Sequence, residues 1–195
     1  LAPFLLVMVT SFTRIIVVLH FVRSALGTQT SPPNQVLIGI ALFLTLFIMA
    51  PVMTQINKDC IQPYDKGKLT QEEALNAGLK PIRKFMFEQT NRKDIRLFME
   101  IEKQSNDVSI EKEDEIPTLV LIPAFMISEL RIAFIIGFLI YLPFIVIDMV
   151  VASTLMSMGM MMLPPTTISM PFKILLFVLA DGWALIIGQL VQTFY

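Results

Sequence analysis

The chain has 195 residues, of which 55% are hydrophobic and 16% charged, and its mean hydropathy is +0.70. Apolar runs of this length with few charges exclude an ordinary soluble domain and indicate an integral membrane protein or a part of one. The net charge of −1 gives no indication of nucleic-acid binding, and the single cysteine, Cys60, excludes an intramolecular disulfide. Leu1 is not an initiator residue, so we expect a mature or truncated product.

Charged residues divide the chain into three parts. Residues 57–118 contain 24 of the 31 charged residues, which predicts a water-facing insert between two apolar regions. We therefore expect an all-α fold with a first helical hairpin over 1–56, a small polar helical insert over 57–118 and a second helical region over 119–195. Four apolar stretches are each long enough to cross a hydrocarbon core of about 30 Å: 1–26, 36–56, 119–163 and 172–191.

The first two apolar stretches form a predicted hairpin. The first ends at Gly27, a natural helix C-cap, and the turn after it contains Pro32 and Pro33. The second resumes as a helix with an expected kink at Pro51. Arg14 lies within the first stretch and is costly in lipid, so we expect its side chain to face protein or water.

The polar insert contains signals for short amphipathic helices. Thr70 and Glu73 have the spacing of a capping box, and Gly78 is placed to stop that helix. Pro81 suits the first position of the next helix, and Asn91 is a candidate cap for another. The charges are most simply a solvated face. Their spacing fits no metal site or activated nucleophile, so we expect no catalytic residue, no cofactor and no resident metal.

The stretch 119–163 is too long for a single membrane crossing. As one helix it would measure about 67 Å, more than twice the hydrocarbon thickness, so it must break or leave the bilayer. Pro143 is the breaker near its middle, in a context without charged residues. An apolar turn there requires cover by other protein, because unpaired backbone groups in lipid cost several kcal/mol each. This argues for burial within an assembly.

Isolated charges in the apolar regions are expected to find partners. With turns at Pro143 and at Pro164, Glu129 and Lys173 would each lie about 11 to 12 Å from the same end of two parallel helices. We therefore predict a buried ion pair between Glu129 and Lys173, formed within or between subunits, although separate partners remain possible.

Two further carboxylates raise an enzymatic alternative. Asp148 and Asp181 invite comparison with an intramembrane aspartyl protease, whose two carboxylates share a proton and a water. The glycine context of such a dyad is incomplete here. Hydrogen-bonded structural aspartates are the better interpretation.

The region Ser153–Pro165 contains an unusual run of methionines. Successive residues on a helix point about 100° apart, so one packed face does not account for three in a row. Three interpretations compete: a methionine-rich core, a Cu(I) site made of thioethers, and a flexible hydrophobic constriction. The run comprises Met156, Met158, Met160, Met161 and Met162.

Several long motifs resemble the FliP/SctR family of type III secretion export-gate proteins. The resemblance covers nearly the whole chain in the same order, and the polar insert is its least similar part. The sequences around Pro32 and Pro164 resemble those of the flagellar branch of this family. The motifs are TSFTRIIVVL (10–19), ALGTQTSPPNQVLIGIALFLT (25–45), IPAFMISELRIAF (122–134), GMMMLPP (159–165) and FVLADGW (177–183).

The resemblance implies a subunit of an oligomeric ring, a pentamer in this family, completed by FliQ and FliR subunits into a helical export gate with other export-apparatus membrane proteins. It implies passage of unfolded flagellar substrates across the bacterial inner membrane at the flagellar basal body, with much of the assembly facing the periplasm. The family's methionine gasket maps onto Met160, Met161 and Met162. The alternatives are the equivalent virulence secretion subunit and, less favoured, a Cu(I) transporter.

Overall fold

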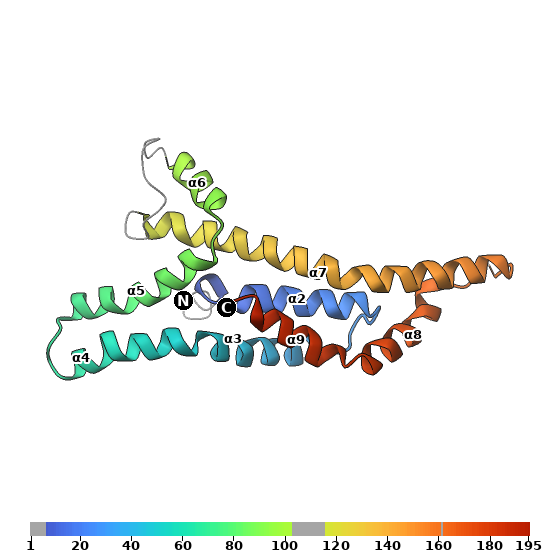
Figure 1. The fold of residues 1–195 in the computed structure, drawn as a ribbon, viewed down its shortest axis with the longest axis horizontal. Helices are drawn as coiled ribbons and strands as arrows, with labels where there is room; N and C mark the ends of the chain where they lie inside the picture. Colours follow the sequence, from blue (N-terminus) through green and yellow to red (C-terminus); the bar gives the residue numbers. More distant parts are fainter. Residues whose placement is uncertain (1–6, 103–115, 161) are drawn as a thin grey trace. The chain divides into compact units, whose positions relative to one another are not determined.

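A computed structural model of the chain describes residues 7–102, 116–160 and 162–195. These residues form helices joined by short turns, with no strand among them (Figure 1). The predicted all-α fold is confirmed. The main elements are α2 Phe12–Ala25, α3 Asn34–Ile56, the π-helix η1 Asn57–Ile61, α4 Gln62–Asp65, α5 Gln71–Gln89, α6 Arg92–Ile101, α7 Thr118–Ser157, α8 Pro165–Leu179 and α9 Gly182–Gln192.

Two of the described segments are long and apolar enough to cross a membrane. One is the 32-residue segment Asn34–Asp65, which joins α3, η1 and α4, and the other is the 40-residue α7. α8 and α9 form a third if they count as one span, with a bend of 67° between them. The described part of the first predicted stretch contains α2, whose 14 residues alone are too few to cross a hydrocarbon core, and residues 1–6 of that stretch lie outside the described residues.

Helix α7 is continuous through Pro143, where a break was predicted. Figure 1 draws it as one helix from yellow to orange. Proline removes one backbone hydrogen bond, and here its ring lies on an exposed side of the helix, where it displaces no core side chain. At 1.5 Å per residue the helix is about 60 Å long, so it must extend well beyond a hydrocarbon core.

Helix α5 combines one confirmed signal with two corrections. The capping box is present: the Thr70 hydroxyl accepts from the Glu73 N–H, and the Glu73 carboxylate accepts from the Thr70 N–H. The helix does not stop at Gly78, and Pro81 lies inside it rather than at a new start. Gly78 instead permits close packing, because a Cβ there would lie 3.3 Å from the Cys60 Sγ.

Other terminal signals are confirmed. The Asn91 side chain accepts from the Lys93 N–H and caps α6. Gly27 follows α2 in the left-handed conformation, with φ +78°, as expected of a helix C-cap.

The chain separates into two compact units, each discontinuous in sequence. Unit 1 comprises Leu1–Arg14 and Phe43–Arg131, and unit 2 comprises Ile15–Leu42 and Ile132–Tyr195. The three segments expected from the charge pattern are therefore not the compact units. In unit 1, the buried rings of Phe85 and Phe125 lie edge to face. The core cluster of unit 2 contains Val22, Ala25, Leu26, Phe144 and Phe177.

Candidate functional site

The methionine run forms the tip of the α7–α8 hairpin in unit 2. α7 ends in a Schellman motif: Gly159 has φ +76°, its N–H donates to the Met156 carbonyl over 3.0 Å, and the Met160 N–H donates to the Leu155 carbonyl over 3.0 Å. Pro164 then occupies the N-cap position of α8 in an extended conformation, without a side-chain capping bond. The predicted break at the two prolines is confirmed, and it makes the chain reverse direction directly after the methionines.

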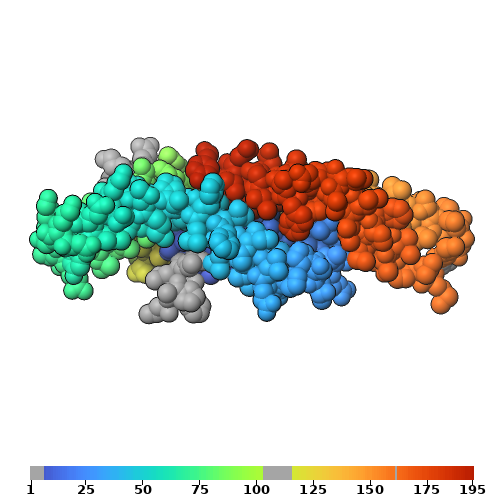
Figure 2. All heavy atoms as spheres, turned by 90° about the horizontal axis from the view of Figure 1, so that it is seen from below, coloured from blue at the N-terminus to red at the C-terminus, as the bar shows by residue number. Residues whose placement is uncertain are grey.

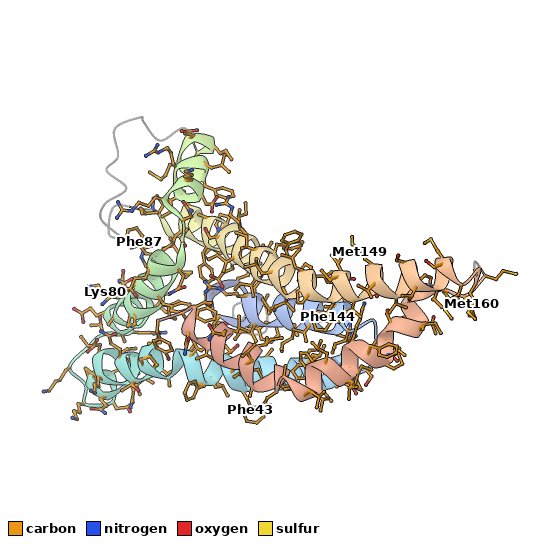
Figure 3. The ribbon with its side chains drawn as sticks, turned by 45° about the vertical axis from the view of Figure 1, so that its right-hand side comes forward. Phe43, Lys80, Phe87, Phe144, Met149 and Met160 are labelled. Carbon is orange, nitrogen blue, oxygen red and sulfur yellow. The ribbon has the colours of Figure 1, made fainter. Side chains whose placement is uncertain are left out.

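The methionine side chains of the tip are exposed within the chain. The exposed fractions are 61% for Met156, 68% for Met158, 44% for Met160 and 98% for Met162; Met161 lies outside the described residues. The tip is the free end of the hairpin, away from α9 (Figures 2 and 3). The four described side chains therefore do not pack into a core of their own chain. They present a soft apolar surface for contact with something else.

A buried ion pair joins the two helices behind the tip. The Lys173 Nζ lies 2.6 Å from the Asp148 Oδ2, and the Ser169 hydroxyl donates to the Asp148 Oδ1 over 2.5 Å. The Lys173 side chain is only 3% exposed, and that of Asp148 is 25% exposed. Both carboxylate oxygens therefore have donors. A buried ammonium needs such a partner, because an uncompensated charge is costly away from water.

The predicted ion pair between Glu129 and Lys173 does not form within the chain. Each residue has a different partner there. Lys173 bonds Asp148, and Glu129 bonds Arg14. The reason is the continuity of α7 through Pro143. Without a turn there, α7 and α8 are antiparallel, and the residue of α7 at the level of Lys173 is Asp148 rather than Glu129.

The Arg14–Glu129 pair lies in unit 1 and is fully buried. The Arg14 Nε donates to the Glu129 Oε2 over 3.0 Å, and its Nη2 bonds both the Glu129 Oε1 and the Gln89 Oε1. Neither charged side chain has any exposed surface. Arg14 thus faces protein, as predicted. This two-point geometry offsets the cost of removing both charges from water.

A second polar network in unit 1 attaches the start of α6 to α7. The Arg131 guanidinium donates to both Asp94 oxygens, over 2.9 and 2.6 Å. The Ser128 hydroxyl donates to Asp94 over 2.6 Å and accepts from the Asn91 N–H over 2.9 Å. This network is not among the contacts predicted from the sequence. Its signal was Asp94, a charged residue on the face of α6 that also carries Ile95 and Met99.

The two aspartates of the protease alternative have different surroundings. Both oxygens of Asp148 are engaged by Lys173 and Ser169. Asp181 is exposed at the bend before α9, with φ +49° and no side-chain cap bond. A dyad needs two carboxylates sharing one proton, whereas Asp148 has an ammonium as its partner. The arrangement favours the structural interpretation of Asp148.

Comparisons with known proteins agree over nearly the whole chain. The model of the FliP family matches residues 1–190. Flagellar biosynthetic protein FliP of Bacillus subtilis is 55% identical over 99% of this chain and 86% of its own length. The proteins of that name from Pectobacterium carotovorum and Aquifex aeolicus are 50% and 48% identical, over 74% and 81% of their own lengths and 99% and 100% of this chain. The chain belongs to the FliP family.

Proposed function

We propose that this chain is a pore-forming subunit of the flagellar type III protein export gate, which conducts unfolded substrates across the inner membrane. Membership of the FliP family supports this proposal, and the similar proteins share the name flagellar biosynthetic protein FliP. The virulence subunit and the Cu(I) transporter are not favoured by these comparisons. The protein acts as a conduit and performs no chemistry of its own.

The exposed methionine tip is the observation that carries the proposal. An apolar side chain gains free energy when another surface covers it, and four exposed methionines at one turn call for cover from outside the chain. In a ring of subunits, Met160, Met161 and Met162 of the copies would cover one another around the pore. Methionine has three flexible side-chain torsions, so this closure deforms around varied passing side chains.

The proposal implies a particular assembly. The chain is a homo-oligomer of five copies, completed by FliQ and FliR subunits and attached to other membrane proteins of the export apparatus. The complex belongs to the bacterial inner membrane at the flagellar basal body, with much of it on the periplasmic side. The length of α7, about 60 Å, supports such a raised position, because half of the helix lies outside a 30 Å hydrocarbon core.

Truncation of the tip tests the gate. Replacing Met160, Met161 and Met162 together by alanine should leave the yield of assembled complex unchanged and should raise resting ion conductance, since the widened constriction no longer excludes water. The two measurements are ion conductance across membranes that contain the complex and the amount of assembled complex. A variant that assembles normally and stays as tight as the parent would contradict the gate.

Two single variants serve as matched controls. Met149 is exposed on α7 away from the tip, so Met149→Ala should leave resting conductance per assembled complex unchanged. Met86 is buried in unit 1, so Met86→Ala should lower stability by about 2 to 5 kcal/mol without a specific leak. If the triple variant behaves like Met86→Ala, the methionine run is a packing element of the assembly and not a gate.

A further inference from the structure

Two contacts between α7 and α8 share one register. The Lys173 ammonium meets Asp148, and the Phe177 ring lies 6.3 Å from that of Phe144, measured between centroids. Each pair has its midpoint in sequence between residues 160 and 161, at the methionine tip. The two contacts therefore fix the register of α8 against α7. The turn between the helices is centred on the methionine tip, where Figure 3 labels Met160.

The polar contact is the more selective of the two. Ser169 and Lys173 are four residues apart on α8, so they lie on one face and both reach the Asp148 carboxylate. A slip of one helical turn displaces that carboxylate by about 5.4 Å, beyond hydrogen-bonding reach of both donors. The Lys173 charge would then be buried without a partner. An aromatic contact tolerates such a displacement better, because a neighbouring apolar group replaces the ring.

We propose that Asp148, Ser169 and Lys173 form a register clamp that sets the height of the methionine tip and thereby the closure of the gate. Asp148 is a positioning residue in this scheme, since it does not touch the substrate. The inference rests on the proposed function. A ring seals only when the methionines of all copies lie at one level, so a hairpin that slips in a single copy opens a gap at the constriction.

The clamp differs from a purely structural contact in what its loss changes. A structural contact lowers the yield of folded or assembled protein. The clamp, once broken, leaves an assembled complex whose resting constriction leaks, because the Schellman turn and the Phe144–Phe177 contact still hold the hairpin together. Resting ion conductance per assembled complex is therefore the deciding quantity.

The experiment compares Asp148→Ala with the exchanged pair Asp148→Lys/Lys173→Asp in complexes containing all partner subunits. Asp148→Ala should raise resting conductance per complex severalfold, and the exchange should restore a tight state, since it rebuilds the ion pair in the same register. Asp181→Asn is the matched control, because Asp181 is an exposed carboxylate of unit 2 at the bend between α8 and α9, outside the clamp. Complexes with Asp181→Asn should not leak.

The outcomes separate the clamp from the gate. If Asp148→Ala complexes have the resting conductance of the parent while the triple methionine variant leaks, the clamp is wrong and the proposed gate is supported. If the triple methionine variant assembles and does not leak, the proposed gate itself is wrong. If Asp148→Ala does not assemble, Asp148→Asn decides, because it keeps an acceptor for Ser169 and loses only the charge: a leak supports the clamp, and a tight complex overturns it. Loss of assembly in both variants also overturns it, since the residue would then hold the complex together.

Discussion

The two compact units both contain a buried ion pair but differ in what surrounds it. In unit 1 the Arg14–Glu129 pair has no exposed surface, and Gln89 accepts a further bond from the guanidinium. In unit 2 the Lys173–Asp148 pair lies behind a tip of exposed methionines. Both units complete these ion pairs within the chain, and both leave large apolar side chains exposed, such as Phe43 in unit 1 and Phe138 in unit 2. The exposed methionines of the tip belong to unit 2. We therefore expect loss of the Arg14–Glu129 pair to act mainly on the stability of unit 1, and changes at the tip to act mainly on the proposed gate.

The largest effect should follow from breaking the buried pair of unit 1. Arg14→Met leaves the Glu129 carboxylate buried without its cation, which costs about 3 to 5 kcal/mol. Thermal unfolding of the purified protein measures the loss. Adding Glu129→Gln should recover part of it, because the remaining group is neutral. Lys84→Ala is the control: its contact with Glu88 is exposed and spans 3.9 Å, so its loss should cost about 0 to 1 kcal/mol.

Charge reversal at Lys173 should have the next largest effect, and it sharpens the comparison by identifying the partner. Lys173→Glu does more than remove the ion pair, because it places two carboxylates together and their repulsion forces α7 and α8 apart. It should therefore lower the yield of assembled complex, whereas Asp148→Ala should not. Rescue by Asp148→Lys identifies the pair within the chain as the essential one. Rescue by Glu129→Lys instead identifies the pair between subunits that the sequence suggested. The yield of assembled complex is the measurement, and failure of Asp148→Lys to rescue would exclude the pair within the chain as a determinant of assembly.

A smaller effect is expected from filling the space at Gly137. A Cβ there would lie 2.4 Å from the Phe21 ring, which also packs edge to face on Phe134. Gly137→Ala should therefore destabilise unit 2 by about 1 to 3 kcal/mol through overpacking. Gly39→Ala is the matched control in α3, where a Cβ meets nothing within 4 Å. It should stabilise the isolated chain by about 0.5 to 1 kcal/mol through helix propensity, so equal effects of the two substitutions would contradict the close approach.

The smallest effect concerns the capping box of α5. Thr70→Ala should lower stability by about 1 kcal/mol, because the N3 backbone N–H loses its acceptor. The Thr70 backbone N–H, and then its hydroxyl, donate to Glu73 and hold the pKa of that carboxyl below its usual value. A lowered pKa stabilises the fold above the unfolded pKa, and this contribution is lost as pH falls through the folded pKa. Unfolding measured across the acidic range should show a weaker pH dependence for Thr70→Ala than for the parent.

Local signals in the sequence predicted local structure well. The capping box at Thr70, the Asn91 cap, the Gly27 C-cap and the break at Pro164 each depend on a few neighbouring residues, and each is confirmed. Two of these features are local hydrogen bonds between a side chain and the backbone, and the other two are local backbone conformations of glycine and proline. Such features are readable without tertiary information.

Predictions that depended on packing fared less well. Pro143 and Gly78 have low helix propensity, yet both lie inside helices, because tertiary contacts along α7 and α5 outweigh the cost at one position. The partner of Glu129 is Arg14, which is 115 positions away, and no spacing rule identifies so distant a contact. The sequence did single out Arg14, Glu129 and Lys173 as charges that need partners. The choice between partners depends on which helices are continuous.

The length and exposure of α7 have a consequence for biogenesis. Large apolar side chains along its outer face, including Phe134, Phe138 and Val146, are exposed in the single subunit. A newly synthesised copy without partners therefore presents the kind of surface that aggregates or that quality-control proteases recognise. We expect surplus copies to be degraded, so that the cellular amount of this protein follows the supply of its assembly partners rather than the rate of its own synthesis.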